Sequence, residues 1–157
     1  MKVDSSFILE AWKNASRMPA GKTIFSLMIK RLIPYTGALG SKVLKLEKGK
    51  SEVRLKDRRG IRNHLSSIHA MALANLGEFA TGLAVTTGIP PNHRAILKSF
   101  QIDYLKKARG TLIAKASYAH QESDEGTQDV SVSGNILNTQ NETVATVQAL
   151  WRIGKNK

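Results

Sequence analysis

The chain contains no cysteine and only four histidines among its 157 residues. The absence of cysteine excludes disulfide scaffolds, thiolate metal sites and cysteine nucleophiles, and it leaves the redox compartment open. No two histidines are spaced by one helical turn, as the ligands of a zinc-binding helix are, which argues against a metal enzyme. We therefore expect neither a metal nor another resident cofactor.

Long apolar runs are missing as well. Residues 65–91 are nearly free of charge, but they are rich in Ala, Gly, Thr and Ser and contain Glu78, so they are too polar to span a membrane. Residues 1–10 carry Asp4 and Glu10 and lack the apolar core of a secretory signal. These observations predict a cytoplasmic protein with no membrane partner.

Acidic residues are scarce relative to basic ones. The chain has 24 Lys and Arg against 12 Asp and Glu, which gives a net charge of +12 and a pI near 10.2. Such a surface attracts anions, and nucleic acid is one candidate. The basic residues are scattered, however, aromatic residues make up 6% of the chain, and neither an aromatic RNP strand nor a KH loop occurs. A nucleic-acid partner is therefore not expected, and a basic nucleic-acid-binding protein is the weakest of the alternatives.

The spacing of apolar residues predicts an α+β fold. The predicted elements are helices at 7–18 and 23–33, strands at 43–46 and 53–55 around Gly49, a helix at 68–87 capped by Ser66 or Ser67, strands at 95–106, 111–120, 128–137 and 143–153, and turns at Gly110, Asp124-Glu125-Gly126 and Asn138–Asn141. The long helix has an apolar stripe, and small residues fill its other faces, so no face looks solvated and we expect the helix to be wrapped on most sides. We expect one domain over residues 1–157, in which an antiparallel sheet, its last four strands in hairpin succession, curls round this helix.

Residues 63–78 resemble the signature of a known family. They read Asn-His-Leu-Ser-Ser-Ile-His-Ala-Met-Ala-Leu-Ala-Asn-Leu-Gly-Glu, with Asn63 six residues before His69 and Glu78 nine residues after it. This spacing is similar to that of the hotdog-fold acyl-CoA thioesterases of the phenylacetate-pathway type, in which an Asn, a His-Gly-Gly and an acidic residue recur. Residues 104–112 are similar to the strand end and turn that follow the helix there.

The resemblance covers a core at residues 40–153, with residues 1–36 as an N-terminal helical extension. It implies the hotdog fold, in which a curled antiparallel sheet wraps round a long central helix. Ala70 and Met71 stand where the family has two glycines, and Glu78 stands where it has an Asp. The chain looks close to a branch whose members have not been characterised.

The resemblance also implies a thioesterase that hydrolyses acyl-CoA or another acyl thioester, with coenzyme A as part of the substrate. Glu78 lies roughly 13 Å along the helix from His69 and about 180° round it, so both cannot easily face one substrate within one chain. In a homodimer or homotetramer, a two-fold axis would bring Glu78 of one subunit to the helix start of another. The alternative is a non-catalytic hotdog protein that binds acyl groups or acyl-CoA.

Glu78 is the residue best suited to be the base or the nucleophile. It is the sole formal charge between residues 65 and 91, and burial without a cation would raise its pKa. Ala70 and Met71 lie in the first helical turn, where N–H groups without intrahelical partners can polarise a thioester carbonyl. We expect the Ala70 N–H to be the oxyanion donor. The structural alternatives are a Glu78 paired with a Lys or Arg of another strand and an ordinary capped helix start.

The remaining candidates orient the site or bind the substrate. By resemblance, His69 and Asn63 would orient the thioester or the water; by default they are a histidine that holds a loop carbonyl and a turn residue. The candidates for attracting the phosphates of coenzyme A are Arg62, Lys106, Lys107 and Arg109, with Arg58 and Arg59, although any one of them could be an ordinary solvated cation. The apolar candidates for the acyl chain are Met71, Leu97, Phe100, Phe25 and Met28.

Overall fold

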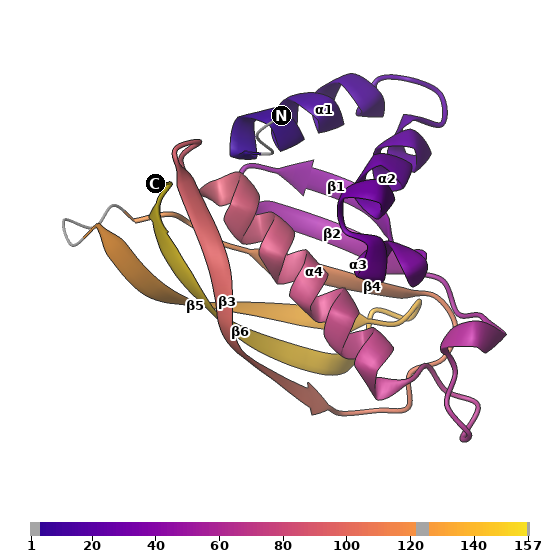
Figure 1. Ribbon diagram of the computed structural model, residues 1–157. Coiled ribbons are helices and arrows are strands. Elements are labelled where there is room, and N and C mark those ends of the chain that lie inside the picture. The colour runs from indigo at the N-terminus through magenta and orange to yellow at the C-terminus, as the bar shows by residue number, and fades with distance from the viewer. Residues whose placement is uncertain (1–3, 122–125, 157) are drawn as a thin grey trace.

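The computed structural model describes residues 4–121 and 126–156. One antiparallel sheet curls round a long helix, and three shorter helices stand beside the edge strand β1 (Figure 1). The helices are α1 (Ser5–Ser16), α2 (Gly21–Leu32), α3 (Pro34–Ala38) and α4 (Ala70–Gly88), with a single 3-10 turn η1 (Arg59–Ile61). The strands are β1 (Lys42–Glu47), β2 (Lys50–Leu55), β3 (His93–Tyr104), β4 (Leu112–Ser117), β5 (Thr127–Leu137) and β6 (Thr143–Lys155). The predicted α+β fold with N-terminal helices is confirmed.

The order of strands across the sheet is β1-β2-β4-β5-β6-β3. The predicted hairpin succession holds for β4, β5 and β6 but is wrong for β3, which pairs with β6 at the far edge. The chain after β3 is held elsewhere: the Leu105 N–H donates to the Val144 carbonyl (2.9 Å), and the Ala108 carbonyl accepts from Ile68 N–H (2.8 Å). Gly110 (φ +70°) therefore turns the chain toward β4 without forming a hairpin with β3.

The helix α4 begins two residues later than predicted, and neither serine caps it. Ile68 is still extended and bridges to Arg62, so the first helical residue is Ala70. The cap is His69, whose Nδ1 accepts a hydrogen bond from the Met71 N–H (3.1 Å). Two short elements, α3 and η1, were not predicted, and Asp124 and Glu125 of one predicted turn lie outside the described residues.

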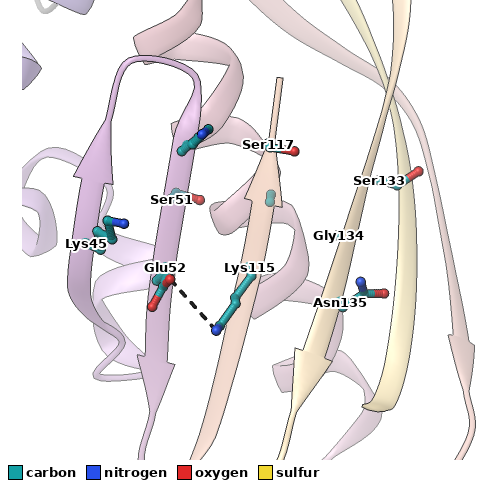
Figure 2. A pocket seen from close by; sticks show the side chains of 10 residues that line it. Lys45, Ser51, Glu52, Lys115, Ser117, Ser133, Gly134 and Asn135 are labelled. Atoms are coloured by element: carbon teal, nitrogen blue, oxygen red, sulfur yellow. Dashed lines mark ion pairs between the residues drawn. The ribbon is translucent and has the colours of Figure 1, made fainter. Parts of the chain in front are cut away.

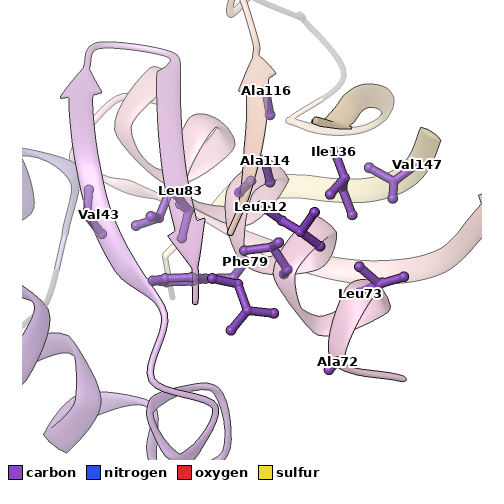
Figure 3. Close-up of a cluster of buried hydrophobic side chains, with 14 of the residues drawn as sticks. Val43, Ala72, Leu73, Phe79, Leu83, Leu112, Ala114, Ala116, Ile136 and Val147 are labelled. Atoms are coloured by element: carbon purple, nitrogen blue, oxygen red, sulfur yellow. The ribbon is translucent and has the colours of Figure 1, made fainter. Parts of the chain in front are cut away.

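The core lies between α4 and the concave face of the sheet, where Leu73, Phe79 and Leu83 of the helix meet strand residues such as Leu112 and Ile136 (Figure 3). From Ala72 to its end, α4 is buried except at four half-buried positions spaced by three and four residues. These positions are Asn75, Glu78, Gly82 and Thr86. The expectation that this helix is wrapped on most sides is therefore confirmed, and from Ala72 onward the half-buried stripe is the one part of it, within the described residues, that is not fully covered.

The close approach of α4 to β6 depends on Gly77, because a Cβ added there would lie 2.5 Å from Val147 Cγ1. Val147 is itself buried and β-branched, so it has little freedom to move away. We expect Gly77→Ala to lower the free energy of unfolding by about 1–3 kcal/mol through overpacking, although Ala is the better helix former. Urea unfolding followed by circular dichroism measures this change.

A double-mutant cycle tests the cause. Val147→Ala alone should destabilise by leaving a cavity, but combined with Gly77→Ala it should cost less than the sum of the two single changes. Strictly additive effects would contradict the proposed contact.

Candidate functional site

A mainly apolar cavity of about 230 Å³ opens on the half-buried stripe of α4. Its walls come from α3, α4 and β3, and its lining residues are Tyr35, Met71, Ala74, Asn75, Glu78, Leu97 and Phe100. Glu78 is the one ionisable carboxylate among them. The cavity therefore places an acid against apolar side chains, the environment in which protonation equilibria shift most.

Burial raises the pKa of the Glu78 carboxyl above its ordinary value, and desolvation is the cause. This is the direction of pKa shift that the sequence predicts. Among the described residues no cation forms an ion pair with the Glu78 carboxylate, so the alternative of a structural ion pair to a neighbouring strand has no support there. A carboxylate whose pKa is raised toward neutrality is a stronger base than an exposed one.

Asn75 lies one helical turn before Glu78 and was missed by the sequence analysis. Its Nδ2 donates to Thr36 Oγ1 of α3 (3.0 Å), which fixes the amide, whereas its buried Oδ1 has no hydrogen-bond partner among the described residues. A buried acceptor without a partner is costly unless something else satisfies it. Asn75 also lines the Glu78 cavity, so this unsatisfied acceptor belongs to a residue of the cavity wall, although the oxygen itself is covered. The only sequence signal was an amide on the same helix face as Glu78.

The start of α4 lies at a second cavity, of about 200 Å³, which is lined by Arg62, His69 and Met71 among others. The Met71 N–H is already donated to His69 Nδ1 (3.1 Å). The Ala70 N–H has no partner among the described residues, so of the two predicted oxyanion donors only Ala70 has a free one. The Ala70 carbonyl accepts from the Tyr104 hydroxyl at the end of β3 (3.1 Å), a contact that the sequence analysis also missed.

The two cavities are adjacent within one chain and share part of their lining. His69 lines one and Glu78 lines the other, while Tyr35 and Met71 line both. The side chains of Tyr35 and Met71 are exposed, at 71% and 57%. This division agrees with the helical geometry, which places His69 and Glu78 on opposite sides of α4.

Asn63 organises the loop that leads into α4. Its Oδ1 accepts from the N–H groups of Leu65 (3.0 Å) and Ser67 (3.2 Å) and from the Ser67 hydroxyl (3.2 Å), and its own N–H donates to the Ser67 carbonyl (2.8 Å). These are the bonds of a turn-forming asparagine. Asn63 lines neither cavity, so within one chain it has the position of a turn residue, which is the default interpretation.

The predicted phosphate-binding cations are mostly engaged elsewhere. Arg62 pairs with Asp57 (2.7 Å), Lys106 pairs with Glu142 (2.7 Å), and Arg109 donates to the Leu65 carbonyl (3.4 Å). Arg58 donates to the Ala38 carbonyl (2.9 Å), and the remaining candidates, Arg59 and Lys107, are exposed. Arg62 alone of these six lines one of the two cavities.

The predicted acyl-chain residues divide into two groups. Met71, Leu97 and Phe100 line the Glu78 cavity, as a pocket for an acyl group requires. Phe25 is buried in the core against Trp12, with ring centroids 5.1 Å apart, and Met28 packs half-buried beside the core. The N-terminal pair therefore supports the helices and does not line the cavity.

Another hollow, of about 380 Å³, lies on the outer face of the sheet over β1, β2, β4 and β5 and contains none of the predicted site residues (Figure 2). Its carboxylate, Glu52, reaches toward Lys115 of the neighbouring strand, 3.8 Å away. Within residues 4–121 and 126–156 no three His, Asp or Glu side chains gather as metal ligands. The open stripe of α4 is thus the better candidate site.

Comparisons with known proteins agree with this architecture. A family described as a domain of unknown function (DUF4442) matches residues 21–153, and no curated protein matches the chain. A crystal structure from a structural-genomics programme has 27% sequence identity and a TM-score of 0.79, over 96% of this chain and 99% of its own.

Two further solved structures are similar. A protein of unknown function from Pseudomonas aeruginosa, described as a probable thioesterase, has 21% identity and a TM-score of 0.75 over 88% of this chain and 97% of its own. The E. coli PaaI protein from the phenylacetic acid degradation operon has 22% identity and a TM-score of 0.69 over 84% of this chain and 91% of its own. These likenesses confirm the hotdog fold that the sequence resemblance implies.

The raised pKa of Glu78 predicts a pH-dependent stability. The folded chain holds the Glu78 proton more tightly than the unfolded chain, so this contribution to stability is present at low pH and is lost as the pH rises above 4.5, the ordinary value, through the folded-state pKa. Glu78→Gln removes the titration. The variant should therefore gain stability relative to the wild type as the pH rises, measured by urea unfolding at a series of pH values.

Glu142 provides a control of opposite sign. Its exposed carboxylate has a pKa lowered by the hydrogen bond from Lys106, so its contribution is present above the ordinary pKa and is lost as the pH falls. Glu142→Gln should lose stability relative to the wild type toward neutral pH. A Glu78→Gln difference that does not vary with pH would contradict the buried-acid interpretation.

Proposed function

The chain belongs to the DUF4442 family, and we propose that it is a thioesterase that hydrolyses acyl-CoA or a related acyl thioester. The observation that carries this proposal is the half-buried Glu78, which has a raised pKa and no paired cation among the described residues, in an apolar cavity on the central helix. Support also comes from the free Ala70 N–H and from a structural neighbour described as a probable thioesterase.

In the proposed reaction Glu78 acts as a general base. Its carboxylate takes a proton from a water molecule, whose oxygen attacks the thioester carbonyl carbon. The carbonyl oxygen becomes negative and accepts a hydrogen bond from the Ala70 N–H, which lies at the positive end of the α4 dipole. Collapse of this intermediate breaks the carbon–sulfur bond, and the leaving thiolate receives the proton that Glu78 took. Direct attack by Glu78 as a nucleophile is the variant of this mechanism.

We propose that the site is completed by a second subunit. Within one chain His69 lines the cavity at the helix start and Glu78 lines the adjacent one, which favours a site whose two groups come from different chains. Within the part of the chain that the structure describes, the edge strand β3 pairs with β6 alone and its other side is open, with Ile96 52% exposed. An open edge of this length is suited to strand pairing across a two-fold axis, in a homodimer or as part of a homotetramer.

The other predicted residues have supporting roles in this proposal. His69 caps α4 and so orients the peptide that carries the Ala70 N–H, while Asn63 shapes the loop before it. Arg62, at the cavity of the helix start, is the leading candidate to attract the coenzyme A phosphates. Lys106, Lys107 and Arg109 contribute to the positive field of the same region.

The second candidate function is binding without turnover. The observation that favours it is the exposed Met71 side chain between the two cavities, at one of the positions where the family signature has glycine. A side chain there narrows the approach of a thioester to the Ala70 N–H. In that case acyl-CoA would be held as a ligand.

Thiol release from short, long and aromatic acyl-CoAs tests the proposal. We expect wild-type turnover of at least one ester, and little turnover by Glu78→Gln, which keeps the shape of the side chain and removes the base. Ala70→Pro removes the oxyanion N–H, and we expect it to lower kcat about 10²- to 10³-fold. Proline suits this position, because Ala70 is the first helical residue and His69 has the extended ψ of 141° that a residue before proline adopts.

Ala70→Ser is the matched control, because it retains the N–H and should retain activity. Melting temperatures of all variants monitor the fold. If the wild type releases no thiol but acyl-CoA raises its melting temperature, the binding function replaces the enzymatic one.

Mixing two inactive variants tests the shared site. When Glu78→Gln and Ala70→Pro proteins are unfolded and refolded together, half of the dimers combine one chain of each kind, and each such dimer has one intact site. Activity should return to about one quarter of the wild-type value. Light scattering at the assay concentration gives the oligomeric state, and a mixture that stays inactive or a monomeric active species would contradict the shared site.

A further inference from the structure

One segment near the N-terminus carries charge of positive sign only. Residues 11–46 contain seven Lys and Arg and no Asp or Glu; the cations are Lys13, Arg17, Lys22, Lys30, Arg31, Lys42 and Lys45. This segment includes the second half of α1, all of α2 and α3, and most of β1. It contains no carboxylate, and among the described residues Lys45 is the one cation of the segment that forms an ion pair, with Glu47 just beyond it (3.2 Å).

Exposed apolar side chains gather in the same segment. The described residues include eleven exposed large hydrophobic side chains, and six of them lie between residues 18 and 35. They are Met18, Ile24, Leu27, Leu32, Ile33 and Tyr35. Exposed apolar groups that cluster mark a surface that contacts another molecule, whereas scattered ones are ordinary.

The two features meet on one face of α2. Phe25 and Ile29 are buried on the inner face, which is also fixed to β1 by the hydrogen bond from the Val43 N–H to Ser26 Oγ (3.1 Å). Ile24 and Leu27 point away from that face and are 53% and 56% exposed. Arg31 follows Leu27 by one turn, and Arg17 precedes Met18 in the turn between α1 and α2.

We propose that the outer face of α2, with Ile24, Leu27 and Arg31, binds the surface of an anionic lipid bilayer together with Arg17 and Met18 of the turn before it. Aliphatic side chains enter the boundary between headgroups and acyl chains, while cations beside them attract anionic headgroups. No helix in the described part of the chain is long and apolar enough to cross a bilayer, so this contact is with the surface only. The sequence predicts no membrane partner because residues 65–91 are too polar to span a bilayer, but contact with the surface needs no spanning segment.

Other occupants fit this face less well. A second copy of the chain would bring two exclusively cationic segments together, and like charges repel. Nucleic acid would satisfy the cations but leave Ile24 and Leu27 without an apolar environment. The face stands beside β1, at the edge of the sheet opposite β3, so pairing through β3 leaves it free (Figure 1). Lipid binding therefore does not depend on the thioesterase activity.

Co-sedimentation of the full chain with vesicles tests this proposal. One set contains phosphatidylcholine alone, and the other contains phosphatidylcholine with phosphatidylglycerol. We expect binding to the anionic vesicles that falls with added salt, and little binding to the neutral ones. Replacing both cations, in Arg17→Gln with Arg31→Gln, should weaken binding about 25-fold, since each cation near an anionic surface contributes about fivefold. Ile24→Ser with Leu27→Ser should weaken it roughly tenfold by removing the apolar contact.

The matched control is Lys48→Gln with Lys50→Gln, which removes the same charge at the β1–β2 turn. This pair lies at the opposite end of β1 from the Val43–Ser26 contact, beside Gly49, whose N–H donates to Thr87 Oγ1. The control should bind like the wild type apart from a small general effect of charge. Equal loss in the control pair, equal binding to both kinds of vesicle, or no binding at all would overturn the proposal. So would an Ile24→Ser, Leu27→Ser variant that changes the oligomeric state but not vesicle binding.

Discussion

The packing of α4 inside a curled sheet is the constraint on which the rest of the structure depends. Because the sheet and the N-terminal helices cover α4 on nearly all sides, small residues such as Gly77 are required where strands pass close to it. A polar side chain on such a helix can reach solvent only along the stripe that stays open. Asn75 and Glu78 both lie on that stripe, so the helix packing itself determines where chemistry is possible.

The electrostatics of the chain single out the same place. Asp57, Asp129 and Glu142 each accept a hydrogen bond from a neighbouring cation, which lowers the pKa of the carboxyl and keeps it charged. Glu78 differs in that burial raises its pKa, and no cation of residues 4–121 or 126–156 pairs with it to offset the cost. In a chain with twice as many basic as acidic residues, such an unpaired acid indicates that a cation is kept out of the cavity.

Features that depend on local pattern were predictable from the sequence. Alternating apolar residues gave the strands, small residues gave the buried helix, and the lack of nearby charge indicated the raised pKa of Glu78. The position of β3 was not predictable, because strand pairing is a long-range choice and β3 pairs across the sheet with β6. The cap by His69 and the buried amide of Asn75 depend on side-chain contacts that residue spacing does not encode.

The hydrogen bond from the Tyr104 hydroxyl to the Ala70 carbonyl links the edge strand β3 to the start of α4. Tyr104 is the last residue of β3, the strand whose other side is open, and Ala70 is the first residue of the helix. A shift of β3 along its own axis would therefore move the residue whose N–H is the proposed oxyanion donor. A molecule that binds along this edge of the sheet would, through the same hydrogen bond, affect the orientation of that N–H.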